Sequence, residues 1–127
     1  MKDPNLSLRV SLTPMQTIRR RSYTELLEAS IMQRTQWVVF EQNGETLWEK
    51  VRRTITDYLT SEWRKGALLG RKPEEAFFVR CDRTTMTQSD LDQGRLICVV
   101  GVAPVKPAEF VVFQISQWTA DHKVDSM

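Results

Sequence analysis

The sequence has few of the residues that enzymes use for nucleophilic or metal chemistry. It contains one histidine, His122, which follows the last apolar segment. Its two cysteines, Cys81 and Cys98, are far apart in the chain and show no Cys-x-x-Cys spacing. A catalytic triad or a zinc site needs several such side chains in a defined arrangement. We therefore expect no enzymatic activity, no cofactor and no metal site.

Long apolar runs and a strong excess of one charge are also missing. The first twenty residues include Lys2, Asp3 and Arg9 and lack the apolar stretch of a signal peptide. Eighteen Lys and Arg against sixteen Asp and Glu leave a net charge of +2, too small to indicate nucleic-acid binding. We expect no membrane insertion, no nucleic-acid partner, and reduced thiols at Cys81 and Cys98.

Enough apolar residues are present for one folded domain. The chain has 127 residues, of which 41% are hydrophobic and 27% charged, a composition typical of globular proteins. Near the N-terminus, Leu6, Leu8, Val10 and Leu12 alternate with polar residues, which predicts an extended segment that ends at Pro14. We place an N-terminal arm or edge strand at 1–16, a folded domain at 17–119 and a flexible tail at 120–127.

Helical periodicity marks two segments of the domain. Residues 17–33 have apolar side chains near helical spacing, and residues 45–65 have the clearest one-sided apolar stripe, followed by Gly66 as a natural helix end. Between them, the apolar run 36–40 precedes the turn pair Asn43-Gly44, and we interpret this run as a buried extended piece. Two main helices are therefore predicted.

The second half of the chain predicts strands. Residues 76–82, 96–102 and 109–118 are rich in β-branched and aromatic residues. Thr87 or Ser89 could cap a single helical turn that ends before Gly94, and the stretch with Gly70 and Pro73 is expected to be a loop. Together these elements predict an α+β fold, with a small, mostly antiparallel sheet packed against two main helices and with extended terminal arms.

The last strand is apolar on both faces in its first half. Phe110 and Val112 share one face, and Val111, Phe113 and Ile115 share the other. A domain of this size has little material with which to cover both faces. We therefore expect part of this strand to meet another chain.

A series of motifs from residue 35 onward resembles the C-terminal domain of contractile phage tail sheath proteins, including those of R-type bacteriocins and extracellular contractile injection systems. The matching segments are TQWVVFE (35–41), LWEKVRR (47–53), WRKGAL (63–68), PEEAFFVRCD (73–82), TTMTQ (84–88), GRL (94–96) and GVAPVKPAEF (101–110). Residues 1–34 match less well. Family sheaths are several times longer than this chain.

The resemblance implies a structural sheath subunit. Copies would stack helically around an inner tail tube protein and contract to drive that tube through a target envelope. Partners would be other sheath subunits, the tube and, as a further candidate, the baseplate. Assembly would take place in the bacterial cytoplasm, and the mature protein would belong to a virion tail or an extracellular contractile particle.

The resemblance also implies strand exchange between subunits through terminal arms. We expect the segment from Gln114 to the tail to act as the arm and residues 6–12 of a neighbouring copy to be its partner. The residues expected at these contacts are Leu6, Leu8, Val10, Leu12, Phe110, Val111, Val112, Phe113, Ile115 and Trp118.

Two points stay open at this stage. The first concerns Arg64, Lys65, Arg71 and Lys72, which would contact the inner tube in a sheath but would otherwise only complement the helix end and solvate the loop. The second concerns the role of the chain. A short accessory protein that caps or regulates sheath assembly by occupying one strand socket is the alternative to a sheath subunit.

Overall fold

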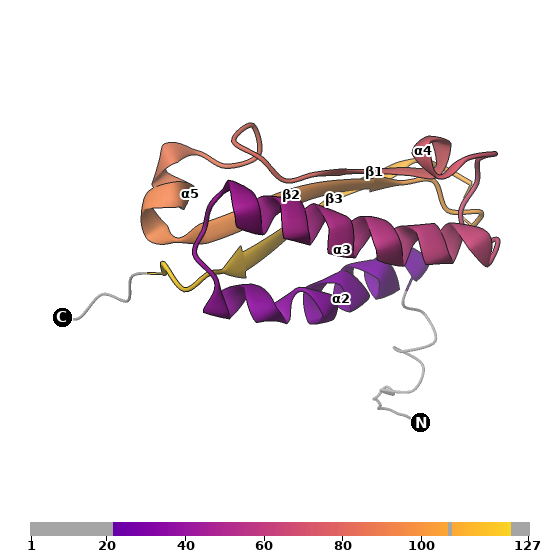
Figure 1. Cartoon of the computed structure of the whole chain (residues 1–127). Coiled ribbons are helices and arrows are strands. Elements are labelled where there is room, and N and C mark those ends of the chain that lie inside the picture. Colours follow the sequence, from indigo (N-terminus) through magenta and orange to yellow (C-terminus); the bar gives the residue numbers. More distant parts are fainter. Residues whose placement is uncertain (1–21, 107, 123–127) are drawn as a thin grey trace, which may run out of the picture.

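The computed structural model describes residues 22–106 and 108–122 of the chain, in a helix layer packed on a small sheet (Figure 1). This confirms the predicted α+β fold, while the expected N-terminal arm lies outside the described residues. The helices are α2 (Tyr23–Arg34), the 3-10 helix η1 (Gln36–Phe40), α3 (Glu45–Arg64), α4 (Pro73–Ala76) and α5 (Gln88–Gln93). The strands are β1 (Phe77–Arg80), β2 (Arg95–Val102) and β3 (Val111–Trp118).

The two main helices form where the sequence predicts them. Helix α3 buries one stripe of apolar side chains, among them Val51, Ile55 and Leu59, and ends just before Gly66, whose φ of 85° suits a glycine. Helix α2 begins with a capping box in which Ser22 and Glu25 exchange side-chain and backbone hydrogen bonds. The described helix therefore starts at Tyr23, inside the range that the periodicity indicates.

Two short segments differ from the expectation. The run 36–40 is a 3-10 helix rather than an extended piece, because the amide of Val38 donates to the carbonyl of Thr35 at 3.2 Å and that of Glu41 to Val38 at 3.0 Å. The expected loop before β1 contains α4, whose first residue is Pro73. Proline suits this position since its missing N–H would have no partner in a first turn.

The sheet is antiparallel, in the order β1-β2-β3. Helix α5 connects β1 to β2. Of its two predicted caps, Thr87 is the one used: its side chain accepts from the amide of Asp90 at 3.0 Å. Gly94 ends α5 with a left-handed φ of 76°, which turns the chain into β2.

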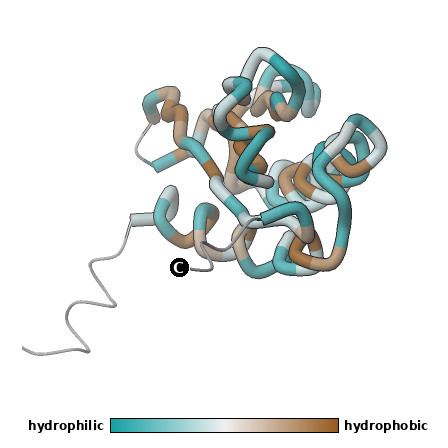
Figure 2. The backbone as a smooth tube through the Cα atoms, turned by 90° about the vertical axis from the view of Figure 1, so that its left-hand side faces the viewer, coloured by the Kyte–Doolittle hydropathy of each residue, from teal (hydrophilic) through white to brown (hydrophobic). Residues whose placement is uncertain are grey.

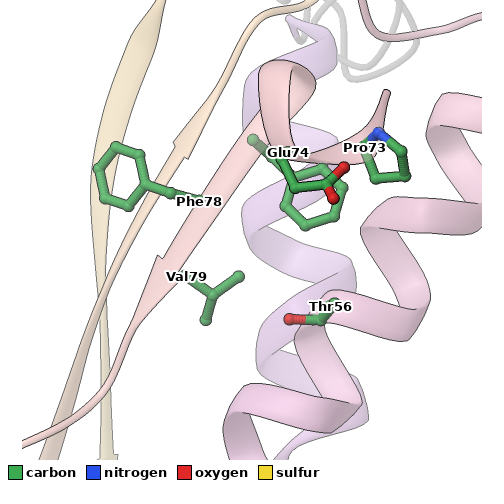
Figure 3. Close-up of a pocket in the computed structure, with 6 residues that line it drawn as sticks. Thr56, Pro73, Glu74, Phe78 and Val79 are labelled. Atoms are coloured by element: carbon green, nitrogen blue, oxygen red, sulfur yellow. The ribbon is translucent and has the colours of Figure 1, made fainter. Parts of the chain in front are cut away.

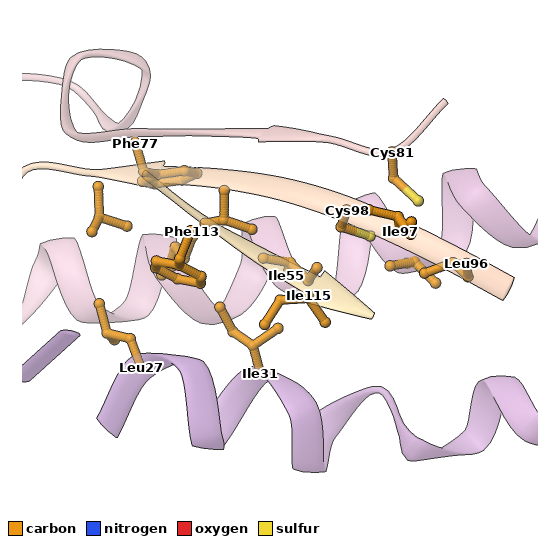
Figure 4. Close-up of a cluster of buried hydrophobic side chains, with 14 of the residues drawn as sticks. Leu27, Ile31, Ile55, Phe77, Cys81, Leu96, Ile97, Cys98, Phe113 and Ile115 are labelled. Atoms are coloured by element: carbon orange, nitrogen blue, oxygen red, sulfur yellow. The ribbon is translucent and has the colours of Figure 1, made fainter. Parts of the chain in front are cut away.

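The core lies between the sheet and the helices, which cover one face of it. Leu27 and Ile31 of α2 point toward Phe113 and Ile115 of β3 (Figure 4). Figure 2 shows hydrophobic and hydrophilic residues alternating along the coiled parts of the tube, as expected for a helix such as α3 with one buried side. Full burial of a leucine or isoleucine side chain stabilises the folded state by roughly 1.5–3 kcal/mol. Neither α2 nor α3 packs on the opposite face of the sheet.

Candidate assembly surface

In the described part of the chain, one backbone edge of strand β3 is not paired with another strand. The amide of Thr119 donates to the carbonyl of Gly94 at 2.9 Å, just beyond the β2–β3 register. Because hydrogen-bonded pairs recur at every second residue of an antiparallel ladder, the odd-numbered residues of β3 bond to β2. The even-numbered residues from Val112 to Trp118 direct their amides and carbonyls away from it. Since β3 is the last strand of the sheet among residues 22–106 and 108–122, these groups line an edge that no described strand covers, here called the free edge of β3.

Strand β1 forms the other edge, which is shorter. The amide of Ala103 donates to the carbonyl of Ala76 at 2.9 Å, so the same alternation places the amide and carbonyl of Val79 on the outside. The amide of Phe77 is already bonded to the carbonyl of Pro73. Strand β1 therefore offers an incoming strand fewer backbone groups than β3 does.

A groove of about 580 Å³ runs beside the β1 edge. Its lining residues are Thr56, Pro73, Glu74, Phe77, Phe78 and Val79. Figure 3 shows the side chains of Val79 and Thr56 in the space between β1 and α3, with Pro73 and Glu74 of α4 at one end. The groove is mostly apolar and open to solvent, but α3 and α4 flank it and limit the approach to β1.

The face of the sheet that points away from α2 and α3 carries an aromatic surface, here called the outer-face patch and formed by Phe78, Phe110 and Val112. The rings of Phe78 and Phe110 stack with centroids 5.9 Å apart. Both lie over Gly101, where a Cβ atom would come within 2.2 Å of Phe78 and 2.7 Å of Phe110. Phe110 and Val112 are each 54% exposed. An exposed aromatic cluster of this kind is typical of an interaction surface.

The far end of β3 is held by the residues that follow it. The indole of Trp118 stacks on the imidazole of His122, with ring centroids 3.8 Å apart, and the guanidinium of Arg95 lies 5.8 Å from the Trp118 ring centre. The amide of Ala120 donates to the carbonyl of Glu41 at 2.9 Å. The start of the expected tail thus packs against the domain, and the domain boundary at 119 stays a prediction.

The structure divides the predicted strand contacts into two groups. Phe110, Val112 and Trp118 are exposed, and Val111 is half-buried. Phe113 and Ile115 are buried in the domain's own core, so their side chains are not free to meet another chain. The four contacts expected at 6–12 lie outside the described residues.

Within the single chain, the segment from Gln114 to Trp118 is paired with β2 rather than extended away from the domain, and its expected role as an arm between subunits stays a prediction. The ladder with β2 continues through the pairs Val99–Gln114 and Arg95–Trp118. The physical reason is that Ile115 on this half of the strand is needed to close the core. The free edge of β3 is therefore the feature of the described chain that could bind another strand.

Similarity to a known protein family identifies the domain that contains β1 and β3. The family model described as the phage tail sheath C-terminal domain matches residues 12–117. The chain belongs to the phage tail sheath C-terminal domain family. It is therefore a structural tail domain, as the motifs between 35 and 110 indicated.

Solved structures agree with this assignment. A chain in the cryo-EM structure of the anti-feeding prophage baseplate is 42% identical, with a TM-score of 0.62, over 74% of this chain and 26% of that one. A chain in the contracted PVC sheath complex of an extracellular contractile injection system is 41% identical, with a TM-score of 0.61, over 74% and 27%. The sheath domain thus spans about a quarter of these relatives' length. A comparison with curated proteins finds no match.

The predicted tube-contact residues lie around one end of the sheath domain. Lys65 forms an ion pair with Glu62, with Nζ 3.0 Å from Oε2. The loop that carries Arg71 and Lys72 is tied to α3, because the indole nitrogen of Trp63 donates to the carbonyl of Gly70 at 2.8 Å. Arg64, Arg71 and Lys72 are exposed, and within residues 22–106 and 108–122 they have no ion pair.

Sequence reasoning missed the groove beside β1. Only α4, at one end of the groove, had a sequence signal, because proline followed by acidic residues, as in Pro73-Glu74-Glu75, is typical of a helix start. Residues 22–106 and 108–122 contain no helix that is long and apolar enough to cross a membrane. They also contain no group of three or more His, Cys, Asp or Glu side chains arranged to hold a metal ion.

Proposed function

We propose that the chain is a structural subunit of a contractile tail sheath and that it joins other subunits by strand addition at the free edge of β3. The observation that carries this proposal is the row of outward backbone groups from Val112 to Trp118. Each backbone hydrogen bond contributes about 0.5–1.5 kcal/mol net. Several such bonds, made along one strand, give a connection that is strong and defined in direction.

The incoming strand in this proposal is the segment 6–12 of a neighbouring copy. Its alternation of Leu6, Leu8, Val10 and Leu12 with polar residues fits a strand with one apolar face. Its length of seven residues is close to the eight residues of β3. The apolar side chains would continue either the core side of the sheet or the outer-face patch, to which Val112 belongs.

Strand sharing suits a sheath that contracts. When subunits slide and rotate as rigid bodies, backbone hydrogen bonds within a shared sheet persist, while side-chain contacts between domains can be exchanged. The sheath would stay connected as it shortens and drives an inner tube through a target envelope. The neighbours in the contracted PVC sheath and in the anti-feeding prophage baseplate support a place in such a particle, with baseplate proteins among the partners.

We assign the contact with the inner tube to the basic end of the domain. Arg64, Arg71 and Lys72 are exposed there, and long cationic side chains suit an acidic surface whose contacts must form and break. Lys65 is partly engaged by Glu62 and would contribute less. Assembly in the bacterial cytoplasm precedes release in a tail or an extracellular particle in this account.

A second candidate function follows from the inequality of the two sheet edges. Strand β3 offers four outward residues, whereas the β1 edge centres on Val79 and is flanked by α3 and α4. A chain that uses β3 to occupy one strand socket of a growing sheath, and that presents no comparable second edge, would stop extension of the sheath. It would then be a capping or regulatory protein rather than a repeating subunit.

Electron microscopy of the purified chain, alone and mixed with full-length sheath, tests both candidates. A repeating subunit forms rings or filaments or enters the sheath at a regular ratio. A capping protein shortens sheaths when it is present far below the concentration of sheath subunits. A chain that stays monomeric at high concentration and does not change sheath assembly would contradict both.

A further inference from the structure

The two cysteines lie across from each other at the end of the β1–β2 ladder. The register ends with Arg80 paired to Val99, so one further step brings Cys81 opposite Cys98. The backbone groups of Cys98 belong to its bonded pair with Ile115, which makes the cysteine pair a non-hydrogen-bonded one. Such pairs have Cα atoms about 4.5 Å apart, within the range of about 4.4–6.8 Å that disulfides span.

The side chains of both cysteines point into the layer between the sheet and the helices. Cys81 and Cys98 are free thiols with 0% exposure, and Figure 4 shows them on the side of β1 and β2 that faces the helices. We propose that this pair is a reversible cross-linking site, which forms an internal disulfide between β1 and β2 when the protein meets an oxidising thiol–disulfide couple. This inference does not depend on strand addition at β3.

The pair is protected until β1 opens. The hydrogen bond with Cys81, together with burial, raises the pKa of the Cys98 thiol, so it is not a thiolate in the closed structure and reacts slowly. Strand β1 has only four residues and lies at a sheet edge, so it opens more easily than β2 or β3. The carbonyl of Cys81 accepts a bond from Nη1 of Arg52 at 2.5 Å, which holds the end of β1 on α3 between openings.

The reaction with oxidised glutathione consists of two exchanges. The thiolate of one cysteine attacks a glutathione sulfur, forms a mixed disulfide and releases one glutathione thiolate. The thiolate of the second cysteine attacks the protein sulfur of that mixed disulfide and releases the second glutathione thiolate. The protein loses two protons and two electrons, and one oxidised glutathione becomes two reduced molecules.

The cross-link would fasten the shortest strand to the centre of the sheet. The loop that it closes contains α5 and runs from Cys81 to Cys98. Closing a loop of this length restricts the unfolded chain. For a domain of this size we expect the melting temperature of the oxidised protein to rise on the order of 10 °C.

The test uses the full chain, purified reduced and incubated at neutral pH in glutathione buffers of increasing oxidised fraction. Free thiols are then counted in denaturant, and the intact mass is measured. We expect both thiols to be lost together, with the mass reduced by two hydrogens, in a product that remains a single chain without reductant. Reduction should restore both thiols and the original melting temperature.

Three results would overturn the proposal. In the first, the thiols of the folded protein stay free at ratios of oxidised to reduced glutathione that oxidise a two-cysteine peptide of the same spacing. In the second, stable glutathione adducts form in place of the internal disulfide. In the third, disulfides form between chains. Cys98→Ala provides the control, because it leaves Cys81 without its partner. We expect this variant to show no gain in melting temperature on oxidation, and a gain equal to that of the wild type would also contradict the proposal.

Discussion

The hydroxyl of Tyr23, at the start of α2, donates a 2.5 Å hydrogen bond to Oε1 of Glu62, near the end of α3. The other carboxylate oxygen lies 3.0 Å from Nζ of Lys65. Burial raises the pKa of Glu62, but the hydrogen bonds from Tyr23 and Lys65 outweigh it and lower that pKa below the ordinary value of 4.5. A nearly buried carboxylate therefore stays charged and joins the two helices of the sheath domain.

Removing the hydroxyl of Tyr23 should weaken this connection. We expect Tyr23→Phe to lower the free energy of unfolding by about 1–3 kcal/mol, because the charged acceptor on Glu62 loses a donor. Urea denaturation of the full chain measures the change. Tyr58→Phe is the matched control, since Tyr58 packs under the guanidinium of Arg34 through its ring, and we expect a change within about 0.5 kcal/mol. Equal losses in the two variants would contradict the account.

Glu62 should also make stability depend on pH. A carboxyl group whose pKa is lower in the folded than in the unfolded state contributes stability above the unfolded value, and that contribution is lost as pH falls through the folded pKa. The window therefore lies below pH 4.5, the ordinary value. We expect Glu62→Gln to be less stable than wild type at pH 7 and the difference to shrink as pH falls through this window. A constant difference between pH 7 and pH 3, measured by thermal melts, would show that Glu62 is not the responsible group.

The sequence predicted the fold where a pattern was long. The helix at 45–65 was found because its apolar stripe continues over several turns, and β2 and β3 were found from their β-branched residues. The extended conformation expected for 36–40 was wrong because a run of four apolar residues, Trp37 to Phe40, fits an extended segment as well as a short helix. Its conformation depends on local bonds such as that from the indole nitrogen of Trp37 to the carbonyl of Arg34, at 2.8 Å.

The candidate assembly surface was only partly predictable. Alternation showed that β3 has two apolar faces, but it did not show which face the helices cover. That choice is made by packing of Leu27 and Ile31 against Phe113 and Ile115. Nor did the sequence reveal that the second half of β3 stays paired with β2, because pairing depends on residues far away in the chain.

Two neighbouring residues of β3 should respond differently to the same change. We expect Val112→Asp to change the free energy of unfolding by less than about 1 kcal/mol, because Val112 is exposed, and to weaken assembly beside the outer-face patch. Phe113→Asp should unfold the domain, since it places a charge in the core and removes a buried ring. Circular dichroism checks the fold and sedimentation checks assembly. A folded Phe113→Asp protein would contradict the arrangement of β3.

The basic end of the domain should affect binding to the inner tube selectively. We expect the double variant Arg71→Glu and Lys72→Glu to weaken co-sedimentation with purified tubes by roughly tenfold or more, because it replaces attraction by repulsion, and to leave the fold intact. The double variant Lys50→Glu and Arg53→Glu, which changes the net charge by the same amount, is the control. Arg53 is exposed on α3, where it pairs with Glu49 at 3.6 Å. Equal losses in both proteins would show that net charge, rather than this surface, is what matters.

The central claim is that the backbone edge of β3 binds another strand, and Gln114→Pro tests it most directly. The amide of Gln114 faces away from β2, so proline removes an outward donor without breaking the domain's own ladder. Gln114→Ala keeps the amide, and Val79→Pro makes the same change at the outward position of β1.

Electron microscopy and sedimentation of each variant, mixed with full-length sheath, give the measurement, with circular dichroism to confirm folding. The account predicts that folded Gln114→Pro loses incorporation into sheath or its effect on sheath length, while Gln114→Ala and Val79→Pro retain it. Wild-type behaviour of a folded Gln114→Pro protein would contradict strand addition at β3.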